Sequence, residues 1–425
     1  MDYFNYKQGK LFAEDVPVET IASQVGTPVY IYSKATFLEH LQKTRRAYSD
    51  LETTVCFSVK ACNNINILKF MADAGYGFDI VSGGELYRAM QAGADPAKIV
   101  YAGVGKTDKE IIEALGAGIA YLSIESEAEI ENLIRLSKQK GKTPKAALRI
   151  NPDVDPKTHT YTATGVKETK FGVDIERAEK VFEQFGKNAN VRLCALHIHL
   201  GSAGHTVQPY VEAINKTLAL VDKLRSKGFV IEALDIGGGY GADYVTAQSP
   251  TAEDYAAAIV PMLKGKGLKL ILEPGASIAA NAGILLTRVL YCKTGGSKKF
   301  VIVDAGMNDL IRPPLYGAFH FIWPAEVDEK FVPASRDKQI KIPGTEAVDV
   351  VGPICENADF FAKDRCLPPA KRGDLLSIFT AGAYGFTMAS NYNARGRAAE
   401  VLADGDKFSI IRKRETYENL VALEK

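Results

Sequence analysis

The feature that most constrains the fold is a strand-then-helix rhythm that repeats between residues 55 and 275. Eight short segments are rich in β-branched or aliphatic residues and show little polar alternation, which is typical of parallel strands buried on both faces. These segments are Val55–Val59, Gly77–Val81, Lys98–Ala102, Ile119–Ile124, Lys145–Ile150, Arg192–Leu200, Ile231–Ile236 and Lys269–Leu272. Eight such units predict a closed (β/α)₈ barrel of the TIM type, with an open doubly wound sheet as the structural alternative.

Between these strands the apolar residues follow the period of a helix, at intervals of three and four. One such series is Val211, Ile214, Leu218, Val221 and Leu224. Two helices are predicted to begin with capping boxes, in which a hydroxyl and a glutamate three positions later satisfy the first free N–H groups. The two boxes are Thr107–Glu110 and Ser126–Glu129.

The chain is too long for one ordinary core, and its rhythm changes after Gly283. At 425 residues two domains are expected. Later segments look like strands joined by turns, which predicts a mostly β second domain. They are Ile284–Lys293, Lys299–Asp304, Ala347–Val351, Asp374–Thr380 and Phe408–Arg412. We therefore expect an α/β barrel over residues 28–282 and a β-rich domain over 1–27 and 283–425 that completes the active site, with the extended start of the chain pairing with the later sheet.

Composition excludes several classes of function. The 52 basic and 51 acidic residues are interspersed and leave a formal charge of +1, so no basic field is present to attract nucleic acid or a membrane surface. The first residues lack the basic start and apolar run of a signal peptide, and no apolar segment reaches the length that spans a bilayer. Six cysteines without a CxxC pair predict reduced thiols in a cytoplasmic protein.

The stretch Thr54–Asn64 is the strongest candidate for the centre of an active site. Val55, Phe57 and Val59 alternate as in a short buried strand, and Lys60 follows at its carboxyl end, where barrel enzymes place their reactive groups. An enclosed lysine loses hydration, and its neutral amine can then form a Schiff base with an aldehyde. Taken alone, a lysine just past a strand is more often an ordinary surface residue.

Three other strand ends carry groups suited to the same chemistry. His197 and His199, after the sixth strand, are two residues apart and therefore on the same side. The loop Gly237–Gly239 has no side chains, so its backbone N–H groups can converge on a phosphate. Glu273 is fixed by the proline that follows and can pair with a cationic ring nitrogen. A core histidine and a tight turn are the plainer interpretations, but together with Lys60 these are the parts of a pyridoxal 5′-phosphate site.

Three competing patterns are weaker. Gly103-Val-Gly-Lys-Thr107 resembles the end of a P-loop, but Val100 stands where the first glycine must be. The pattern Gly237-x-Gly239-x-x-Ala242 fits a dinucleotide fingerprint and keeps a nicotinamide-dependent dehydrogenase as a competitor, yet it comes late in the repeat. The two histidines have no third metal ligand at a suitable spacing, since neither Cys194 nor His205 qualifies, so no metal is predicted.

Seen together, these residues resemble a known family, the fold-type III pyridoxal phosphate-dependent decarboxylases. The resemblance covers nearly the whole chain. Its motifs are Phe57-Ser-Val-Lys-Ala61, Asn151-Pro-Asp-Val-Asp155, His197-Ile-His-Leu-Gly-Ser202, Gly237-Gly-Gly239, Glu273-Pro-Gly275, Met307-Asn-Asp-Leu-Ile-Arg-Pro313, Cys355-Glu356 and Ala381-Gly-Ala-Tyr-Gly385. Within the family the likeness is greatest to enzymes that decarboxylate meso-2,6-diaminopimelate to L-lysine and carbon dioxide, the last step of lysine biosynthesis.

The resemblance implies roles for the cofactor site. Lys60 would hold pyridoxal 5′-phosphate as a Schiff base, His199 would stack on its ring, and Glu273 would pair with the ring nitrogen and keep it protonated. The residues that would bind the phosphate or border the substrate are Ser202, Gly237, Gly238, Gly239 and Tyr384.

The resemblance also implies how the substrate is recognised. Arg312 and Tyr316 would bind the distal carboxylate of the substrate, because a guanidinium offers a fork that matches two oxygens. Cys355 would deliver a proton and Glu356 would bind the distal ammonium, both reaching the active site of a partner subunit. The implied active unit is a homodimer with shared active sites. Alone, each of these residues is an ordinary buried thiol, turn residue or ion-pair partner.

The sequence departs from the family pattern near the substrate. Ala276 follows Glu273-Pro-Gly275 where the family normally has arginine, and a missing charge-assisted hydrogen bond costs about 1.5–3 kcal/mol. Asn357-Ala358 and Ala203 also stand where the family commonly has Ser-Gly and glutamine. These changes keep open a decarboxylase of another amino acid, such as lysine or ornithine. A non-catalytic binding protein is a further alternative, although it would be expected to lack Lys60 or Cys355.

Overall fold

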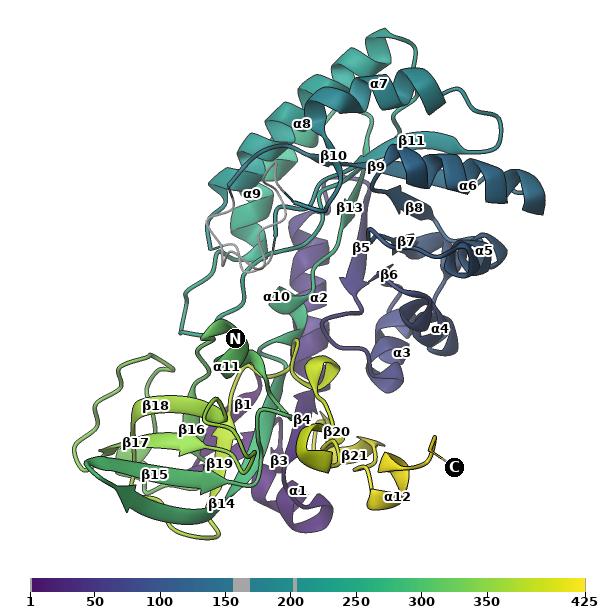
Figure 1. Cartoon of the computed structure of the whole chain (residues 1–425). Helices are drawn as coiled ribbons and strands as arrows, with labels where there is room; N and C mark the ends of the chain where they lie inside the picture. The colour runs from purple at the N-terminus through teal and green to yellow at the C-terminus, as the bar shows by residue number, and fades with distance from the viewer. Residues whose placement is uncertain (1, 156–168, 202–204, 425) are drawn as a thin grey trace. The chain divides into compact units, whose positions relative to one another are not determined.

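The computed structural model describes most of the chain, which divides into two compact units. The described residues are 2–155, 169–201 and 205–424. The barrel unit comprises residues 40–241 and 249–277, and the β unit comprises 1–39, 242–248 and 278–425. The prediction placed the first boundary after residue 27, whereas the division falls after Glu39. Figure 1 labels the elements of both units.

The barrel unit is built on parallel strands that close into a ring, which confirms the barrel and excludes the open sheet. Within the described part of the chain, each of the eight predicted strands is present and hydrogen-bonded to two neighbours. The ring runs through β5 (Thr53–Ser58), β6 (Gly77–Ile80), β7 (Ile99–Tyr101), β8 (Tyr121–Ile124), β9 (Lys145–Asn151), β11 (Arg192–His197), β12 (Ala233–Asp235) and β13 (Lys269–Leu272), and β13 pairs with β5. A short strand, β10 (Val173–Asp174), adds to β9.

Helices follow the barrel strands along the chain and lie outside the ring (Figure 1). They are α3 (Ile65–Asp73), α4 (Gly83–Gln91), α5 (Asp108–Ala117), α6 (Glu127–Lys140), α7 (Ile175–Phe185), α8 (Gln208–Ser226) and α9 (Ala252–Leu263). Helices α2 (Lys34–Ala47) and α10 (Ala276–Ala279) cross the boundaries of the units. No helix in the described ranges combines the length and the apolar character that crossing a membrane requires.

One predicted capping box forms completely and the other only in part. Thr107 accepts from the Glu110 N–H at 3.3 Å, and the Glu110 carboxylate accepts from the Thr107 N–H at 2.9 Å. Ser126 likewise accepts from the Glu129 N–H at 3.2 Å. The Glu129 carboxylate instead accepts from the N–H of Glu125 at 2.7 Å, one residue further back. This glutamate is therefore used to fix the end of strand β8.

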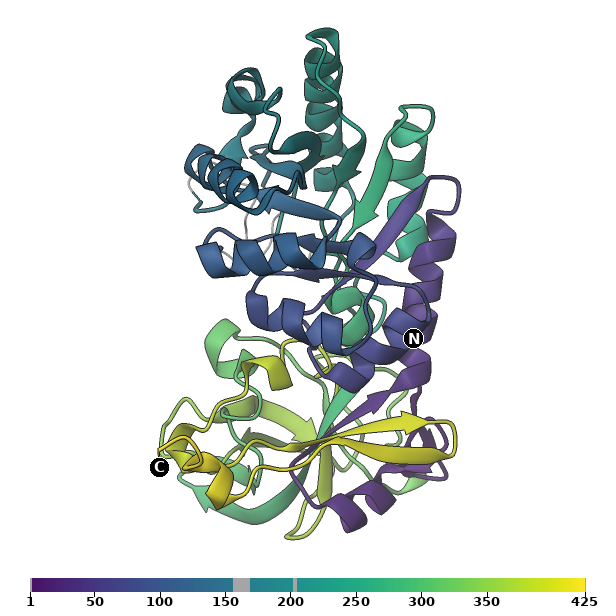
Figure 2. The same cartoon turned by 90° about the vertical axis from the view of Figure 1, so that its right-hand side faces the viewer.

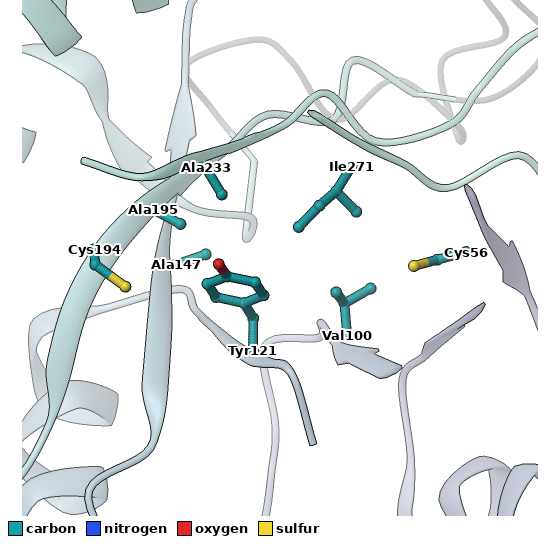
Figure 3. Close-up of a cluster of buried hydrophobic side chains, with 8 residues drawn as sticks. All are labelled: Cys56, Val100, Tyr121, Ala147, Cys194, Ala195, Ala233 and Ile271. Carbon is teal, nitrogen blue, oxygen red and sulfur yellow. The ribbon is translucent and has the colours of Figure 1, made fainter. Parts of the chain in front are cut away.

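The inside of the barrel is packed with side chains. Figure 3 shows the Tyr121 ring surrounded by side chains from the other strands. The buried cluster consists of Cys56, Val100, Tyr121, Ala147, Cys194, Ala195, Ala233 and Ile271. The small alanine side chains leave room for the tyrosine ring, so a barrel of this size is filled at this level. Groups that react with a ligand are then confined to the ends of the strands.

The β unit contains a larger sheet and a small one. The main path of the larger sheet is β18-β17-β15-β14-β4-β20-β21, with β16 and β19 beside it. Its strands are β4 (Val29–Ser33), β14 (Gly283–Gly295), β15 (Lys298–Val303), β16 (Ile322–Pro324), β17 (Glu346–Val351), β18 (Phe360–Leu367), β19 (Leu375–Ile378), β20 (Ala399–Asp404) and β21 (Lys407–Arg412). Figure 2 shows the β20–β21 hairpin in yellow. The short helices of this unit are α1 (Val18–Val25), α11 (Arg312–Tyr316) and α12 (Tyr417–Leu420).

The start of the chain differs from the expectation. Its first strands, β1 (Phe4–Lys7), β2 (Lys10–Ala13) and β3 (Val16–Pro17), form a three-stranded sheet of their own, joined to the later part of the unit by a bridge between Lys10 and Glu326. Strand β4 is the N-terminal segment that enters the larger sheet, antiparallel to β14 and parallel to β20. All five residues of β4 are buried. An apolar strand of this kind does not reveal from its sequence which sheet it joins.

Candidate active site

The barrel register brings polar side chains from neighbouring strands to one end of the ring. Ser58 at the end of β5 is in register with Asp79 on β6, and His197 at the end of β11 is in register with Asp235 on β12. Glu273 directly follows β13, and its N–H donates to the Gly237 carbonyl at 2.8 Å. These are carboxyl ends of parallel strands, where barrel enzymes bind their ligands.

Lys60 forms an ion pair that the sequence did not predict. Its Nζ lies 2.5 Å from Oδ2 of Asp79, which is fully buried, while the Lys60 side chain is one-third exposed. The Ser58 hydroxyl donates to the same carboxylate oxygen at 2.7 Å. Burial, and next the charge of Glu273, raise the pKa of Asp79, whereas Lys60 lowers it. Asp79 could have been found as an acidic residue inside an apolar strand, next to the strand that precedes Lys60.

His197, His199 and Glu273 form a cluster in which His197 and Glu273 are buried and His199 is partly exposed. His197 Nε2 lies 3.5 Å from Glu273 Oε2, and His199 Nδ1 lies 3.9 Å from the same oxygen. Burial by itself would raise the pKa of the Glu273 carboxyl, but His197, and then Lys60 and His199, outweigh burial and hold this pKa below its ordinary value. Glu273 is therefore a carboxylate at neutral pH. The pKa of His199 is lowered well below its ordinary range, first by burial and then by Arg149, so His199 is neutral.

The glycine loop holds this cluster in place. Gly237 and Gly239 have φ values of +67° and +85°, which favour glycine. A Cβ on Gly238 would lie 1.9 Å from the Glu273 carbonyl oxygen, so the loop can pass this backbone only without a side chain. The Gly237 N–H donates to Asp235 and the Gly238 N–H donates to His199 Nδ1. Of the three N–H groups predicted to bind phosphate, two thus have protein partners.

A second network, which the sequence did not predict, surrounds the ends of β8 and β9. Arg149 donates to Glu125 at 2.8 Å, and both side chains are buried. The Gly103 N–H donates to the same glutamate, and the nearly buried Lys106 donates to the Gly103 and Ser123 carbonyl oxygens. The segment that resembles a P-loop therefore makes hydrogen bonds within the protein that fix the residues at the end of β8. Burial would raise the pKa of Glu125, but Arg149 outweighs it and the pKa is lowered.

The two histidines and Glu273 each offer one atom of a type that binds metals, and these atoms lie within 4.8 Å of one another. The third group is thus a glutamate from another strand, which sequence spacing could not reveal. The Nδ1 atoms of both rings already have partners, Ser123 for His197 and the Gly238 N–H for His199. Because the Nδ1 atoms are already engaged, Glu273 is the one carboxylate of the cluster, and a carboxylate also binds a protonated nitrogen of a ligand ring.

The β unit gathers aromatic rings around Arg312. Its guanidinium carbon lies 5.3 Å from the ring centre of Tyr244, 5.7 Å from that of Tyr316 and 5.9 Å from that of Tyr384. The Arg312 Nε is buried and has no hydrogen-bond partner in the described chain. Tyr384 has a φ of +55°, which is uncommon for a residue other than glycine and marks a locally constrained backbone. Tyr244 was missed because nothing in its local sequence distinguishes it.

Cys355 and Glu356 lie in a different loop of the same unit and are exposed. The Cys355 N–H donates to Asn393 Oδ1 at 2.8 Å, and Glu356 accepts from the Tyr392 hydroxyl at 2.9 Å. Within the described residues no hydrogen bond or ion pair joins Glu356 to Arg312. Ser202, which the resemblance assigns to the phosphate or the border of the substrate, and Ala203, which replaces the family's usual glutamine, lie outside the described residues.

The barrel and its strand-end residues define the class of enzyme. The family model described as the pyridoxal binding domain of pyridoxal-dependent decarboxylases matches residues 34–280. Curated proteins named diaminopimelate decarboxylase match over the whole length. The protein of Aquifex aeolicus is 46% identical over 99% of this chain and 96% of its own, and that of Pseudomonas aeruginosa is 47% identical over 99% and 98%.

Solved structures agree with this classification. Diaminopimelate decarboxylase of Helicobacter pylori, complexed with L-lysine, has a TM-score of 0.89, 38% identity and coverage of 96% of this chain and 99% of its own. The enzyme of M. jannaschii, also with L-lysine, has a TM-score of 0.92, 36% identity and coverage of 100% and 98%. The chain belongs to the pyridoxal-dependent decarboxylases and, within them, to the family of the diaminopimelate decarboxylases.

The cofactor of this family is pyridoxal 5′-phosphate, and the barrel residues fit it. Glu273 Oε1 is buried, and no N–H group or hydroxyl of the described residues donates to it. A buried carboxylate oxygen without a donor is costly unless a ligand supplies one, and a protonated ring nitrogen is such a donor. Lys60 supplies the amine that the cofactor's aldehyde requires.

Proposed function

We propose that this protein catalyses the pyridoxal phosphate-dependent decarboxylation of meso-2,6-diaminopimelate to L-lysine and carbon dioxide. The observation that carries the substrate is Arg312, whose guanidinium is framed by tyrosine rings and has a buried Nε without a partner in the described chain. A guanidinium with an unused N–H donor can bind a carboxylate at the distal end of an amino-acid substrate. The names of the full-length relatives and the L-lysine bound in two solved relatives support the same substrate and product.

In this proposal the barrel residues bind the cofactor and keep its ring nitrogen protonated. Lys60 holds the cofactor's aldehyde, His199 stacks on its ring, and Glu273 pairs with its ring nitrogen. Gly239, with Gly237 and Gly238 shaping the loop, borders the phosphate, and Ser202 and Tyr384 are assigned to the same end of the cofactor by resemblance. When bound, the cofactor's protonated ring accepts the electron pair that the departing carbon dioxide leaves behind.

Asp79 keeps the Lys60 amine at the end of its strand through the ion pair between them. The neutral state of His199 suits a stacking role, because a neutral ring packs on the cofactor without placing a further cation next to its protonated nitrogen. The barrel residues are therefore proposed to bind and orient pyridoxal phosphate and to carry charges that complement it.

The β-unit residues are proposed to recognise the distal end of the substrate. Arg312, with Tyr316 and Tyr384 beside it, binds the distal carboxylate, and Glu356 binds the distal ammonium. Cys355 delivers the proton that replaces the carboxylate that is lost. Arg312 and Glu356 together describe a substrate whose far end is itself an amino acid. Only a diamino dicarboxylic acid satisfies both groups, whereas lysine and ornithine lack the distal carboxylate.

We further propose a homodimer with shared active sites in the cytoplasm. Cys355 and Glu356 are exposed in the single chain, which suits residues that reach the active site of a partner. None of the six cysteines, all within the described residues, forms a disulfide, which suits a reducing compartment. Mixing two variants of strongly reduced activity, Lys60→Ala and Cys355→Ala, tests the shared site. Recovery of up to about a quarter of the wild-type activity is expected, because half of the dimers are mixed and each mixed dimer has one intact site. No recovery after subunit exchange would contradict the shared site.

The substrate is tested by measuring carbon dioxide release from meso-diaminopimelate, L-lysine and L-ornithine with the purified protein and saturating pyridoxal phosphate. Turnover of meso-diaminopimelate at a kcat/KM at least a hundredfold above the other two is expected, because each lacks a charge-assisted interaction at its distal end. Preferential turnover of lysine or ornithine would establish the alternative that Ala276 suggested. No turnover of any of the three would contradict the proposed reaction.

A further inference from the structure

His197 is a buried titratable side chain to which neither the family resemblance nor the proposed function assigns a role. It ends strand β11, and its side chain is only 1% exposed. Its two ring nitrogens face different partners. Nδ1 lies 2.6 Å from the Ser123 hydroxyl. Nε2 lies 3.5 Å from Glu273 Oε2 and has no hydrogen-bond partner in the described residues, so this carboxylate is the acceptor that faces it. Ser123 and Glu273 are also buried, so solvent does not offer alternative partners to any member of this chain of contacts.

The direction of these contacts follows from the charge of Glu273. An ionised carboxylate only accepts hydrogen bonds, so the nitrogen that faces it must carry a proton. A neutral imidazole then has a lone pair on its other nitrogen, Nδ1, and the Ser123 hydroxyl must donate to it. The backbone at Ser123 is itself fixed, because Lys106 donates to its carbonyl oxygen at 2.7 Å. A charged Glu273 therefore requires Ser123 to donate to Nδ1, and it requires the proton on Nε2, which faces Glu273 Oε2 at 3.5 Å.

The neighbours of Glu273 explain why it needs such support. Asp79 on β6 and Asp235 on β12 are buried acids near it, and Lys60, His199 and Arg149 are the basic groups of the same surroundings. Burial, and next the charge of Glu273, raise the pKa of Asp235, whose carboxyl is also hydrogen-bonded to Glu273, so the two acids compete for one proton. Without the His197 Nε2–H group, Glu273 would hold a larger share of that proton. A protonated Glu273 could not keep a ring nitrogen protonated.

We propose that His197 is a positioning residue: Ser123 selects its Nε2–H tautomer, and the Nε2–H group holds Glu273 as a carboxylate with Oε1 turned to the cofactor's ring nitrogen. This inference rests on the proposed role of Glu273. His197 does not touch the cofactor in this scheme and acts only through the glutamate. A positioning role for His197 requires a hydrogen-bond donor at the position of Nε2. A role in packing the barrel core would require only a side chain of similar volume.

The tautomer of His197 is measured by NMR on the full-length protein labelled with ¹⁵N-histidine, with and without bound pyridoxal phosphate. The chain has six histidines, and the His197→Gln variant assigns the signals of the ring. The expected result at neutral pH is a ring protonated at Nε2 and not at Nδ1. A proton on Nδ1 at neutral pH, in either charge state of the ring, would overturn the proposal.

Ser123→Ala removes the donor that selects the tautomer. A mixture of the two tautomers is expected in this variant, with a dissociation constant for pyridoxal phosphate raised several-fold. The matched control is Ser137→Ala, because Ser137 is equally buried in the same unit and its hydroxyl has no partner in the described residues. An unchanged tautomer in Ser123→Ala would contradict the selection by Ser123.

Two replacements of His197 separate positioning from packing. His197→Leu fills the space without a donor and is expected to weaken pyridoxal phosphate binding about tenfold or more, whereas His197→Gln restores an N–H donor and is expected to stay within about threefold of wild type. Equal losses in both variants would assign His197 to packing and overturn the proposal. The thermal unfolding midpoints of both variants are measured to compare their folding. Failure of the wild-type protein to bind pyridoxal phosphate would contradict the proposed function but leave the tautomer measurement decisive.

Discussion

The two units hold their functional residues in opposite ways. In the barrel unit, Lys60, His199 and Glu273 are positioned by other ionisable side chains, and the carboxylates among them are buried. In the β unit, Arg312 is framed by aromatic rings, while Cys355 and Glu356 sit on an exposed loop. That loop is held through its backbone, since the buried Asp359 accepts from the Met307 and Ile354 N–H groups at 2.6 Å each.

This difference has an energetic consequence. Charges buried together are coupled, so removing one changes the state of the others. Groups that are fixed by rings and backbone contacts can be removed more independently. Substitutions in the barrel unit should therefore disturb cofactor binding and catalysis together, whereas substitutions in the β unit should separate them. The following variants test this comparison.

The largest effect is expected for Lys60→Ala. Loss of the amine removes the group that holds the cofactor, and Asp79 is left as a buried carboxylate without its cation. Turnover of meso-diaminopimelate should fall by about a thousandfold or more, and the visible absorbance of the bound cofactor should change as well. The control is Lys69→Ala, an exposed lysine paired with Asp73. Turnover close to wild type in Lys60→Ala would remove this lysine from the mechanism.

Cys355→Ala should affect catalysis without affecting the cofactor. A positioned acid contributes about 10²-fold or more to a rate, so kcat should fall by about that factor. The absorbance spectrum and the dissociation constant of pyridoxal phosphate should stay as in wild type. Cys292→Ala, which alters another exposed cysteine of the same unit, is the control. Loss of cofactor from Cys355→Ala would contradict the independence of the β unit.

Arg312→Leu should raise KM for meso-diaminopimelate by about tenfold to a hundredfold, because one charge-assisted interaction with the distal carboxylate is lost. The matched control is Arg372→Leu, since Arg372 also lies over a tyrosine ring, 5.2 Å from the centre of Tyr291. Steady-state kinetics measure KM for meso-diaminopimelate in both variants, and Arg372→Leu is expected to keep the wild-type value. An unchanged KM in Arg312→Leu would exclude this arginine from substrate binding.

The smallest effect concerns stability and probes the coupled charges of the barrel unit. Burial, and to a lesser degree Asp79, raise the pKa of Glu85 to about 7, although the Val81 N–H donates to it and acts in the other direction. Because the folded pKa lies above the unfolded value, the contribution of Glu85 to stability is full below about pH 4 and is lost as the pH rises through 7.

Glu85→Gln keeps the acceptor for Val81 but cannot ionise. Relative to wild type, this variant should gain up to about 2 kcal/mol in the free energy of unfolding between pH 5 and pH 8. Urea unfolding at both pH values measures the gain. If the free energies of unfolding of Glu85→Gln and wild type differ by the same amount at pH 5 and at pH 8, Glu85 is not a buried neutral acid.

Much of the barrel and part of its site could be predicted from local patterns. Eight buried parallel strands have a recognisable composition, and Lys60, His199, Gly237–Gly239 and Glu273 each follow such a strand. Strand β4 could not be assigned, because an all-apolar strand fits the centre of either sheet. Strands β16, β18 and β20 were missed. Ile322–Pro324 has only three residues, Phe360–Leu367 mixes charged and apolar residues, and Glu400 interrupts the apolar run of Ala399–Asp404.

The partners of the predicted residues were beyond prediction. Asp79 is recognisable as an acid in an apolar strand, but its contact with Lys60 depends on β5 and β6 being neighbours in register. Ser123 meets His197 across the ring, 74 residues away in sequence. Tyr244 joins Arg312 only because residues 242–248 leave the barrel unit for the β unit. Such contacts arise from tertiary closure and leave no periodic signal in the chain.

The sequence by itself determined the chemistry that this protein carries: a lysine, a histidine, a glycine loop and a glutamate, each at the end of its own buried strand. Local hydrophobic periodicity is enough for that, because it depends on residues close together in the chain. Only the tertiary structure decided the charge of each group, since ionisation depends on burial and on partners from distant strands. The closed ring of strands brings those candidate residues to one end of the barrel, where Glu273 Oε1 is buried without a hydrogen-bond partner in the described residues.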